Sequence, residues 1–380
     1  EAPDYGHETT SEAMSYIVWM AAMHDVLLGG SDLSKAWTTL EAMIPGWSTA
    51  SGRSTDVNYK SIWTQQKLKA DTAPEKDEPS GYPTQNAGVD AENPLYSAYK
   101  TAYGSDNGYY LMNWLADVDD WYGFGGATPG AGNGKFTFIN TFQRGEQESC
   151  FETVPQPCIE ELKFGNPQDG IKGIFNGSNV PKQYSFTNAP DAEDRAIQAV
   201  YFANKYGAGN TTISALAGKM GDQCRNDMFD KYYHAIGCQN IMTSGTTGKL
   251  GAEGGQHYLM SWYTAWGGAL ERYDWAWQIG CSHSHQFYQN PLAAYALLYD
   301  NDIKAGMKAT GAEEDYKKSL QRQIEMYLWL QSKDGPFAGG CTNSYRGRYE
   351  KYPDGYPTFY DMVYVPHPVY ADPGSNHWIG

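Results

Sequence analysis

Apolar side chains recur every three or four positions through several stretches of the chain, which is the spacing of one face of an α-helix. The first stretch covers residues 11–28, starts at Ser11, which can cap a helix, and ends ahead of two glycines. A second stretch covers residues 32–43 and stops before Pro45. Further helical patterns are predicted over residues 111–116, 192–206, 213–236, 256–270, 291–298 and 313–331.

Strand patterns are short and scattered, and residues 135–142 give the clearest one. Repeated helices separated by long aromatic-rich loops predict an all-α assembly rather than a βαβ fold. The longest predicted loop, residues 56–94, is rich in Pro, Ser, Asp and Lys, and it is expected to carry a binding site or to wrap an outer surface. Because no linker and no internal repeat is visible, residues 1–380 are expected to form one domain.

The formal net charge of −16 arises from 44 Asp and Glu residues against 28 Lys and Arg residues. Binding to nucleic acid or to an anionic membrane needs the opposite balance, so neither is an expected partner. No apolar run approaches the roughly 20 residues that span a bilayer, which predicts a soluble chain.

Aromatic residues are unusually frequent, with 30 Tyr, 12 Trp and 13 Phe. Core packing accounts for part of them, but many lie in Gly-, Asn- and Asp-rich stretches typical of loops, such as residues 117–125. Aromatic rings on polar loops suit the apolar faces of sugar rings, while neighbouring Asn, Gln and Asp side chains bind the hydroxyl groups. The composition therefore favours a carbohydrate-handling protein.

The cysteines show no C-x-x-C spacing, which argues against a zinc or redox motif. An even number of them in an acidic, Tyr- and Asn-rich chain favours disulfides formed in an oxidising compartment, and hence a secreted protein. Their connectivity stays open. The six cysteines are Cys150, Cys158, Cys224, Cys238, Cys281 and Cys341.

Carboxylates, a histidine and a tyrosine crowd together at the start of the chain; the carboxylates are Glu1, Asp4, Glu8 and Glu12. Crowded carboxylates raise one another's pKa, which can keep a carboxylic acid protonated near neutral pH. Glu12 falls in the first helical turn, where the macrodipole lowers its pKa while burial and the other carboxylates raise it. Glu12 fits either a general acid or a solvated helix-start glutamate, and His7 fits a structural or a catalytic role equally well.

A second acidic cluster, residues 187–194, also precedes a helix. Asp191 in this cluster lies at or just before the helix cap, where a capping aspartate is ordinary and is the simpler interpretation. The presence of two such clusters far apart in sequence is more informative than either one. Glycoside hydrolysis needs one protonated and one ionised carboxyl group on opposite sides of the scissile bond.

Tryptophan-rich segments would supply stacking platforms for sugar rings. Trp275 and Trp277 alternate as in an extended segment. Trp262 and Trp266 are four positions apart, as on a helix, which equally fits a core stripe.

Two further patterns concern metal ions. His283 and His285 without a nearby third ligand are a weak zinc signal. The acidic run 146–152 offers oxygen ligands for Ca²⁺, with Asp372 as a distant contributor, although a solvated acidic turn fits the run better. The absence of a Gly-rich phosphate loop and of a Gly-x-Ser-x-Gly elbow argues against nucleotide chemistry and the usual serine hydrolases.

Several motifs are spread along the whole chain. In chain order they are EAPDYGHETTSEAMSY, the block from Trp114 through DVDDWYGFG, INTFQRGEQES, TNAPDAEDRAIQA, KMGD with FDKYYHAIG, HYLMSWYTAWGG, YQNPLAAYAL, GGCTNSYRGRYEKYP and PVYADPGSN. Together these motifs resemble the family 48 glycoside hydrolases, processive cellobiohydrolases that attack cellulose from its reducing end. Family catalytic modules are considerably longer, so the chain is expected to be a central part that lacks a short N-terminal piece and a large C-terminal portion.

The resemblance implies an (α/α)6 barrel, incomplete in this chain, and an inverting mechanism in a tunnel that leads to an open cleft. It places the general acid on Glu12 of TTSEA and the base that activates water on Asp191 of TNAPDA, with Glu1 as an auxiliary candidate for the base. The matching substrate-binding positions are Trp114, Asn140, Phe142, Gln143, Lys231, Trp262, Tyr263, Trp275, Trp277, Tyr288 and Trp378. The matching calcium positions are Gln147, Glu148, Glu152 and Asp372.

The function implied by the resemblance is hydrolysis of β-1,4-glucosidic bonds in cellulose by a secreted enzyme without an organic cofactor. Its partners would be cellulose chains and cello-oligosaccharides, with cellulosome or binding modules outside this chain. The alternatives are a chitin-active member of the family and an inactive carbohydrate-binding protein. Asp120 replaces the Asn of the bacterial pattern, and residues 238–255 form a longer stretch than in bacterial members, which suggests a eukaryotic, anaerobic-fungal-like source.

Overall fold

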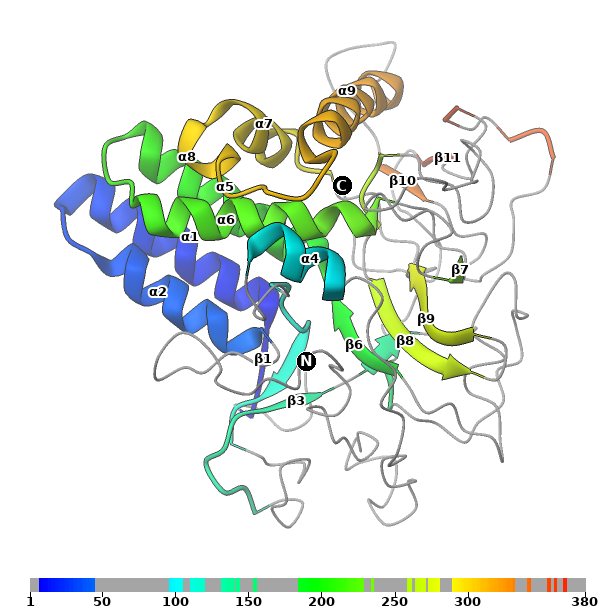
Figure 1. Ribbon diagram of the computed structural model, residues 1–380, viewed down its shortest axis with the longest axis horizontal. Coiled ribbons are helices and arrows are strands. Elements are labelled where there is room, and N and C mark those ends of the chain that lie inside the picture. The colour runs from blue at the N-terminus through cyan, green and yellow to red at the C-terminus, as the bar shows by residue number, and fades with distance from the viewer. Residues whose placement is uncertain are drawn as a thin grey trace.

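Helices predominate in the part of the chain that the structure, a computed structural model, describes, as the helical patterns predict. The helices stack at one side of the molecule, and most strands gather at the other (Figure 1). None of the described helices has the length and apolar character that a bilayer span requires. The described residues are 7–44, 96–104, 110–119, 131–139, 141–143, 153–155, 184–228, 234–235, 258–261, 264–270, 273–280, 289–331, 340–342, 354–356, 359–360 and 365–367.

The first two helices form a hairpin. Helix α1 spans Ser11–Leu28, and its N-cap is Thr10 rather than the predicted Ser11, because the Thr10 hydroxyl accepts a 3.2 Å hydrogen bond from the Ala13 amide. The chain turns at Gly29, whose φ of 74° favours glycine. Helix α2 (Asp32–Leu40) and the 3-10 turn η1 (Glu41–Met43) then complete the predicted second stretch.

Helix α5 (Pro190–Lys205) lies at the centre of the helical layers and packs against α1, α6 (Thr211–Cys224) and α7 (Pro291–Tyr299). Helix α9 (Ala312–Leu330) covers α7 from the outside, and the short α8 (Asn301–Lys304) packs on α6. The predicted helices over residues 192–206, 291–298 and 313–331 are therefore confirmed. Ala, Val and Ile side chains of α5 fill the main hydrophobic core.

Helices α6 and α8 approach each other backbone to backbone. An ideal Cβ added to Gly218 would lie 1.9 Å from the Ile303 carbonyl oxygen, and one added to Gly306 would lie 2.1 Å from the Ala215 carbonyl oxygen. No side chain fits at either position, so the glycines set the distance between the two helices.

Asp222 joins α6 to three other segments. Its Oδ2 accepts hydrogen bonds from the Tyr103 hydroxyl of α4 (Tyr96–Tyr103) at 2.6 Å and from the backbone amides of residues 308–309 at 3.0 and 2.8 Å. Its Oδ1 lies 3.0 Å from Arg225, and Arg225 also donates to Asp315 of α9 at 2.7 Å. Because both partners of the Asp222–Arg225 pair are fully buried, this network fixes the packing of α6 against α4 and α9.

All strand pairs among the described residues are antiparallel. One sheet has the order β1-β2-β3, formed by Glu8–Thr10, Leu115–Asp117 and Thr137–Ile139. A four-stranded sheet has the order β6-β8-β9-β7, formed by Tyr184–Asn188, Thr264–Leu270, Tyr273–Gly280 and His234–Ala235. Two smaller pairs are β4 with β5 (Thr141–Gln143, Thr153–Pro155) and β10 with β11 (Gly340–Thr342, Val365–His367).

Three predicted helices need correction. Residues 111–116 are not helical, and their last part is strand β2, which pairs with β1. The pattern over residues 256–270 ends in strand β8, because Gly267 and Gly268 disfavour a helix interior and Thr, Trp and Leu suit a paired strand. Among the described residues of the stretch 213–236, the α-helix ends at Cys224, the 3-10 turn η6 (Arg225–Asp227) follows, and residues 234–235 form strand β7. Strands β3 and β4 confirm the strand pattern at 135–142.

Helices α4 and α8 were not predicted from the sequence. The predicted loop at residues 56–94 lies outside the described residues. Among the six cysteines, whose even number favours disulfides, Cys224 is a buried free thiol in the described structure. Burial raises the pKa of that thiol well above its usual value, so it stays neutral and unreactive.

Candidate active site

Helices α1 and α5 run parallel, so their first turns lie at the same end of the helical layers. Ser15 of α1 contacts Arg195 of α5, and further along both helices the ring of Trp19 meets the ring of Phe202, with centroids 5.5 Å apart. From the first contact to the second, the residue number rises on both helices, so the two helices run in the same direction. Glu12 precedes the first contact on α1 and Asp191 precedes it on α5, so the two carboxylates share one end of the helix pair.

Glu12 is half-buried in the first turn of α1. The backbone carbonyl of Glu12 accepts a 2.7 Å hydrogen bond from the Ser15 hydroxyl, and its Oε2 accepts a longer one of 3.4 Å from Ser11. The amide of Ser11 donates to the Trp114 carbonyl at 2.9 Å, where β1 pairs with β2. This strand pairing brings the predicted sugar-binding residue Trp114 next to the predicted acid.

Asp191 is 4% exposed and occupies the second position of α5, after Ala189 as the N-cap and Pro190. It is therefore inside the first turn and does not cap the helix as the sequence suggested. Its Oδ2 accepts a 2.9 Å hydrogen bond from Arg195, whereas its buried Oδ1 has no hydrogen-bond partner in the described part of the chain. Burial raises the pKa of Asp191, and the Arg195 charge and hydrogen bond oppose that rise.

Three further carboxyl groups are buried near the first turn of α5, namely Glu193, Asp194 and Asp227. Glu193 accepts a 2.8 Å hydrogen bond from the Met112 amide, and burial raises the pKa of both Glu193 and Asp194 well above the ordinary range. Burial also raises the pKa of Asp227, at the end of η6, to about 7. Asp194 and Glu193 belong to the acidic cluster recognised in the sequence, but Asp227 was missed because nothing near residue 227 indicates proximity to residues 193 and 194.

His7 is held by the acidic segment that follows β2. Its Nδ1 lies 2.9 Å from Asp119 Oδ2, and its carbonyl accepts a 2.8 Å hydrogen bond from the Val118 amide. This contact and the adjoining strand register support the structural alternative for His7, and the catalytic alternative stays a prediction.

A family model described as Glycosyl hydrolase family 48 matches residues 1–380. The chain belongs to this family. It is 48% identical, over its whole length, to the cellulose 1,4-beta-cellobiosidase (reducing end) CelS of Acetivibrio thermocellus, of which it covers 49%. It is 46% identical to exoglucanase-2 of Thermoclostridium stercorarium, covering 40%, and 45% identical to endoglucanase F of Ruminiclostridium cellulolyticum, covering 51%. The chain thus spans about half the length of these relatives or less.

In this family 48 chain, three of the predicted site residues have described side chains, namely Glu12, Asp191 and Trp114. Strand β4 contains Phe142 and Gln143, and strand β9 contains Trp275 and Trp277, so this tryptophan pair is extended as predicted. Trp266 lies in strand β8 and not on a helix. The remaining predicted positions lie outside the described residues: Glu1, Asn140, Lys231, Trp262, Tyr263, Tyr288, Trp378, Gln147, Glu148, Glu152 and Asp372.

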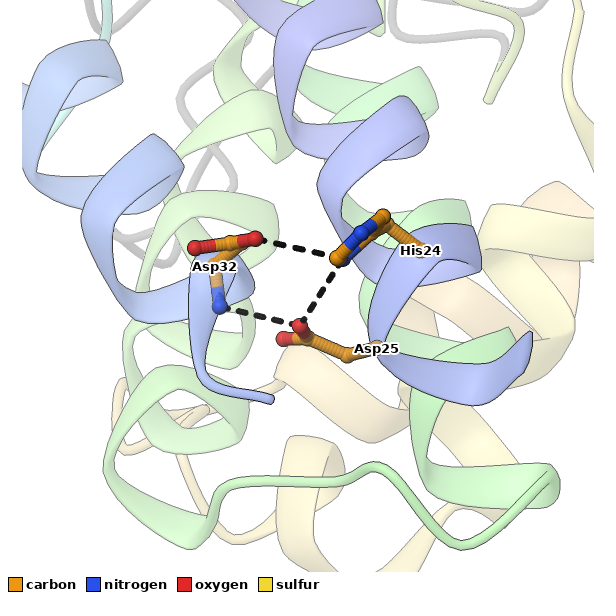
Figure 2. A group of neighbouring side chains, drawn as sticks. All are labelled: His24, Asp25 and Asp32. Atoms are coloured by element: carbon orange, nitrogen blue, oxygen red, sulfur yellow. Dashed lines mark hydrogen bonds and ion pairs between the residues drawn. The ribbon is translucent and has the colours of Figure 1, made fainter. Parts of the chain in front are cut away.

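Among the described residues, the side chains with metal-ligand spacing are His24, Asp25 and Asp32 (Figure 2). They lie where α1 ends and α2 begins, whereas Glu12 lies in the first turn of α1. Both Asp25 oxygens accept backbone amides at the start of α2, from Asp32 at 3.0 Å and from Leu33 at 2.8 Å. Asp32 pairs with His24 at 3.1 Å and with Lys35 at 2.6 Å. Helix capping and these ion pairs account for the cluster without a metal ion.

Proposed function

We propose that the complete protein carrying this chain hydrolyses β-1,4-glucosidic bonds of cellulose and releases cellobiose processively from reducing ends. The observation that supports this most directly is the parallel packing of α1 and α5, which brings the first turns with Glu12 and Asp191 to one end. The names of the relatives, a reducing-end cellobiosidase and an exoglucanase among them, support the substrate and the direction of attack.

In this proposal Glu12 is the general acid and Asp191 is the general base. Glu12 donates its proton to the glycosidic oxygen as the bond to C1 breaks, and Asp191 takes a proton from the water that attacks C1 from the opposite face. The inverting reaction needs roughly 6.5–9.5 Å between the two carboxyl groups to hold that water. Arg195 favours the ionised Asp191 that a base requires.

The test is the product and its anomeric form. The complete protein should release cellobiose from amorphous cellulose, and proton NMR during the first minutes should show the α-anomer ahead of mutarotation. Initial β-anomer would contradict the inverting mechanism. Preferential release of chitobiose from chitin would contradict the substrate, and binding without any release of reducing sugar would identify a carbohydrate-binding protein instead.

We also propose that the helices belong to an (α/α)6 barrel that forms one catalytic domain. The hairpin of α1 and α2 fits an inner and an outer helix of such a barrel, and the parallel neighbours α1 and α5 fit two helices of one layer (Figure 1). A crystal structure of the complete protein would test this, and helices in an open bundle would contradict it.

A structural calcium ion and secretion complete the proposal. The family calcium positions supply only carboxylate and amide oxygens, which suit Ca²⁺, and they lie outside the described residues. Elemental analysis should find calcium in the purified complete protein, and chelation should lower its melting temperature. Secretion predicts that the protein accumulates in the culture medium of its source, and retention inside the cells would contradict it.

A further inference from the structure

Arg195 lies between the first turns of α1 and α5 and contacts side chains of both helices. Its Nη2 donates a 2.9 Å hydrogen bond to Asp191 Oδ2, and its Nη1 donates a 2.8 Å hydrogen bond to the Ser15 hydroxyl. The guanidinium carbon also lies 4.4 Å from the centre of the Tyr16 ring. The Arg195 side chain is only 13% exposed, so water screens these contacts weakly.

The Ser15 hydroxyl extends this contact to Glu12. It donates its one proton to the Glu12 backbone carbonyl at 2.7 Å, which leaves its oxygen free to accept from Arg195. A chain of hydrogen bonds therefore connects the Asp191 carboxylate, through Arg195 and Ser15, to the backbone carbonyl of Glu12. One guanidinium connects the two turns that carry the proposed base and the proposed acid.

The contact between Arg195 and Asp191 lies among several other acidic side chains. On α5, Glu193 and Asp194 neighbour it, and Asp227 of η6 interacts with both of them. Burial raises the pKa of all three, which disfavours their charged forms. Arg195 is the cation that contacts Asp191 in the described structure. From α1, the groups at this end are the polar Ser15, the Tyr16 ring and Glu12, one turn earlier.

We propose that Arg195 is a positioning residue that orients Asp191 as a carboxylate and locks the first turn of α5 to the first turn of α1. This inference rests on the proposed function, since it assigns Arg195 to the spacing of that acid and base. A lysine can supply the charge but not two hydrogen bonds from one planar fork, so the two contributions of Arg195 can be separated by substitution.

The experiment compares the complete protein with three variants on soluble cello-oligosaccharides. In Arg195→Met the acidic limb of the pH profile of kcat/KM should move up by about 1–3 pH units, because the cation that stabilises ionised Asp191 is lost. In Arg195→Lys the limb should stay near its original pH, while kcat falls on the order of 10- to 100-fold with KM nearly unchanged, because the bridge to Ser15 is lost. Ser15→Ala should behave like Arg195→Lys.

The matched control is Lys205→Met, which removes a cation from the other end of α5, where Lys205 lies over the rings of Tyr201 and Tyr206. It should leave both kcat and the pH profile unchanged. Near-ultraviolet circular dichroism and melting temperatures identify variants that do not fold. If Arg195→Met does not fold, the kinetics of Arg195→Lys and Ser15→Ala test the proposal.

A second measurement does not depend on activity. Carbon-13 NMR of aspartate carboxyl groups, with the Asp191 signal assigned from Asp191→Asn, should show Asp191 titrating about 1–3 pH units higher in Arg195→Met than in the parent. An unchanged titration together with an unchanged acidic limb would overturn the role of Arg195 even if the enzyme is active. A parent protein that hydrolyses nothing would refute the proposed function, while the NMR titration would still decide whether Arg195 holds Asp191 ionised.

Discussion

Asn188, the last residue of β6, donates a 2.8 Å hydrogen bond to Asp227 at the end of η6, and both side chains are buried. The four-stranded sheet is thereby tied to the helical layers through a carboxyl group with almost no contact with water. Burial is the largest influence on that group and raises its pKa to about 7, although the hydrogen bonds from Asn188 and Thr264 oppose the rise.

The raised pKa of Asp227 predicts a pH-dependent stability. A carboxyl group whose folded-state pKa exceeds its ordinary value of 3.8 stabilises the fold below about pH 4, and this contribution is lost as the pH rises to about 7. The free energy of unfolding should therefore fall less in Asp227→Asn than in the parent between pH 4 and pH 7. The difference between the two falls should be up to about 4 kcal/mol. Urea unfolding at several pH values measures this, and identical pH slopes would contradict it.

Substitution of the two proposed catalytic carboxyls should separate hydrolysis from binding. Glu12→Gln and Asp191→Asn keep the side-chain shapes but remove the proton donor and the base, so each should lower kcat on cellulose by about 10²-fold or more. Binding of cello-oligosaccharides, measured by calorimetry, should change little. Glu314→Gln, on the exposed face of α9, is the control. Full activity of Asp191→Asn would show that another group activates the water.

Removal of Asp222 should destabilise the whole helical assembly. Asp222→Ala leaves the fully buried Arg225 without one of its carboxylates and removes the acceptor for Tyr103 and two backbone amides. The expected loss is about 3–5 kcal/mol in the free energy of unfolding. Glu313→Gln removes an acid whose ion pairs with Lys304 and Lys317 are exposed, and it should leave the melting temperature nearly unchanged. Similar melting temperatures for the two variants would refute this account.

The close contact between α6 and α8 predicts that Gly218 tolerates no side chain. In Gly218→Ala the new methyl group would meet the Ile303 carbonyl, so the helices must separate and the expected cost is about 3 kcal/mol. Thr212→Ala on the exposed start of α6 is the control and should have little effect. Thermal unfolding of the two variants makes the comparison, and equal stability would mean that α8 shifts freely.

Local sequence accounts for the long helices because their signals are themselves local. Helix-forming runs and end signals predicted α1, α7 and α9 nearly to the residue, since capping depends on neighbours within one turn. The buried face of α1 does not follow its apolar positions, because Ile17 and Met20 are exposed while Ser15 is buried. The acidic character of the two clusters at Glu12 and Asp191 was likewise visible, as was membership of family 48 through the motifs around them.

Tertiary structure decided what depends on partners far away in the chain. Strand β2 formed where a helix was predicted because residues 115–117 pair with β1, more than a hundred residues earlier, and such pairing has no local signature. The contact of Arg195 with Ser15 and the burial of Asp227 are of the same kind. The amino-acid sequence specifies which chemical groups are present. Packing sets their distances and their dielectric surroundings, because both depend on residues that only the folded chain brings together.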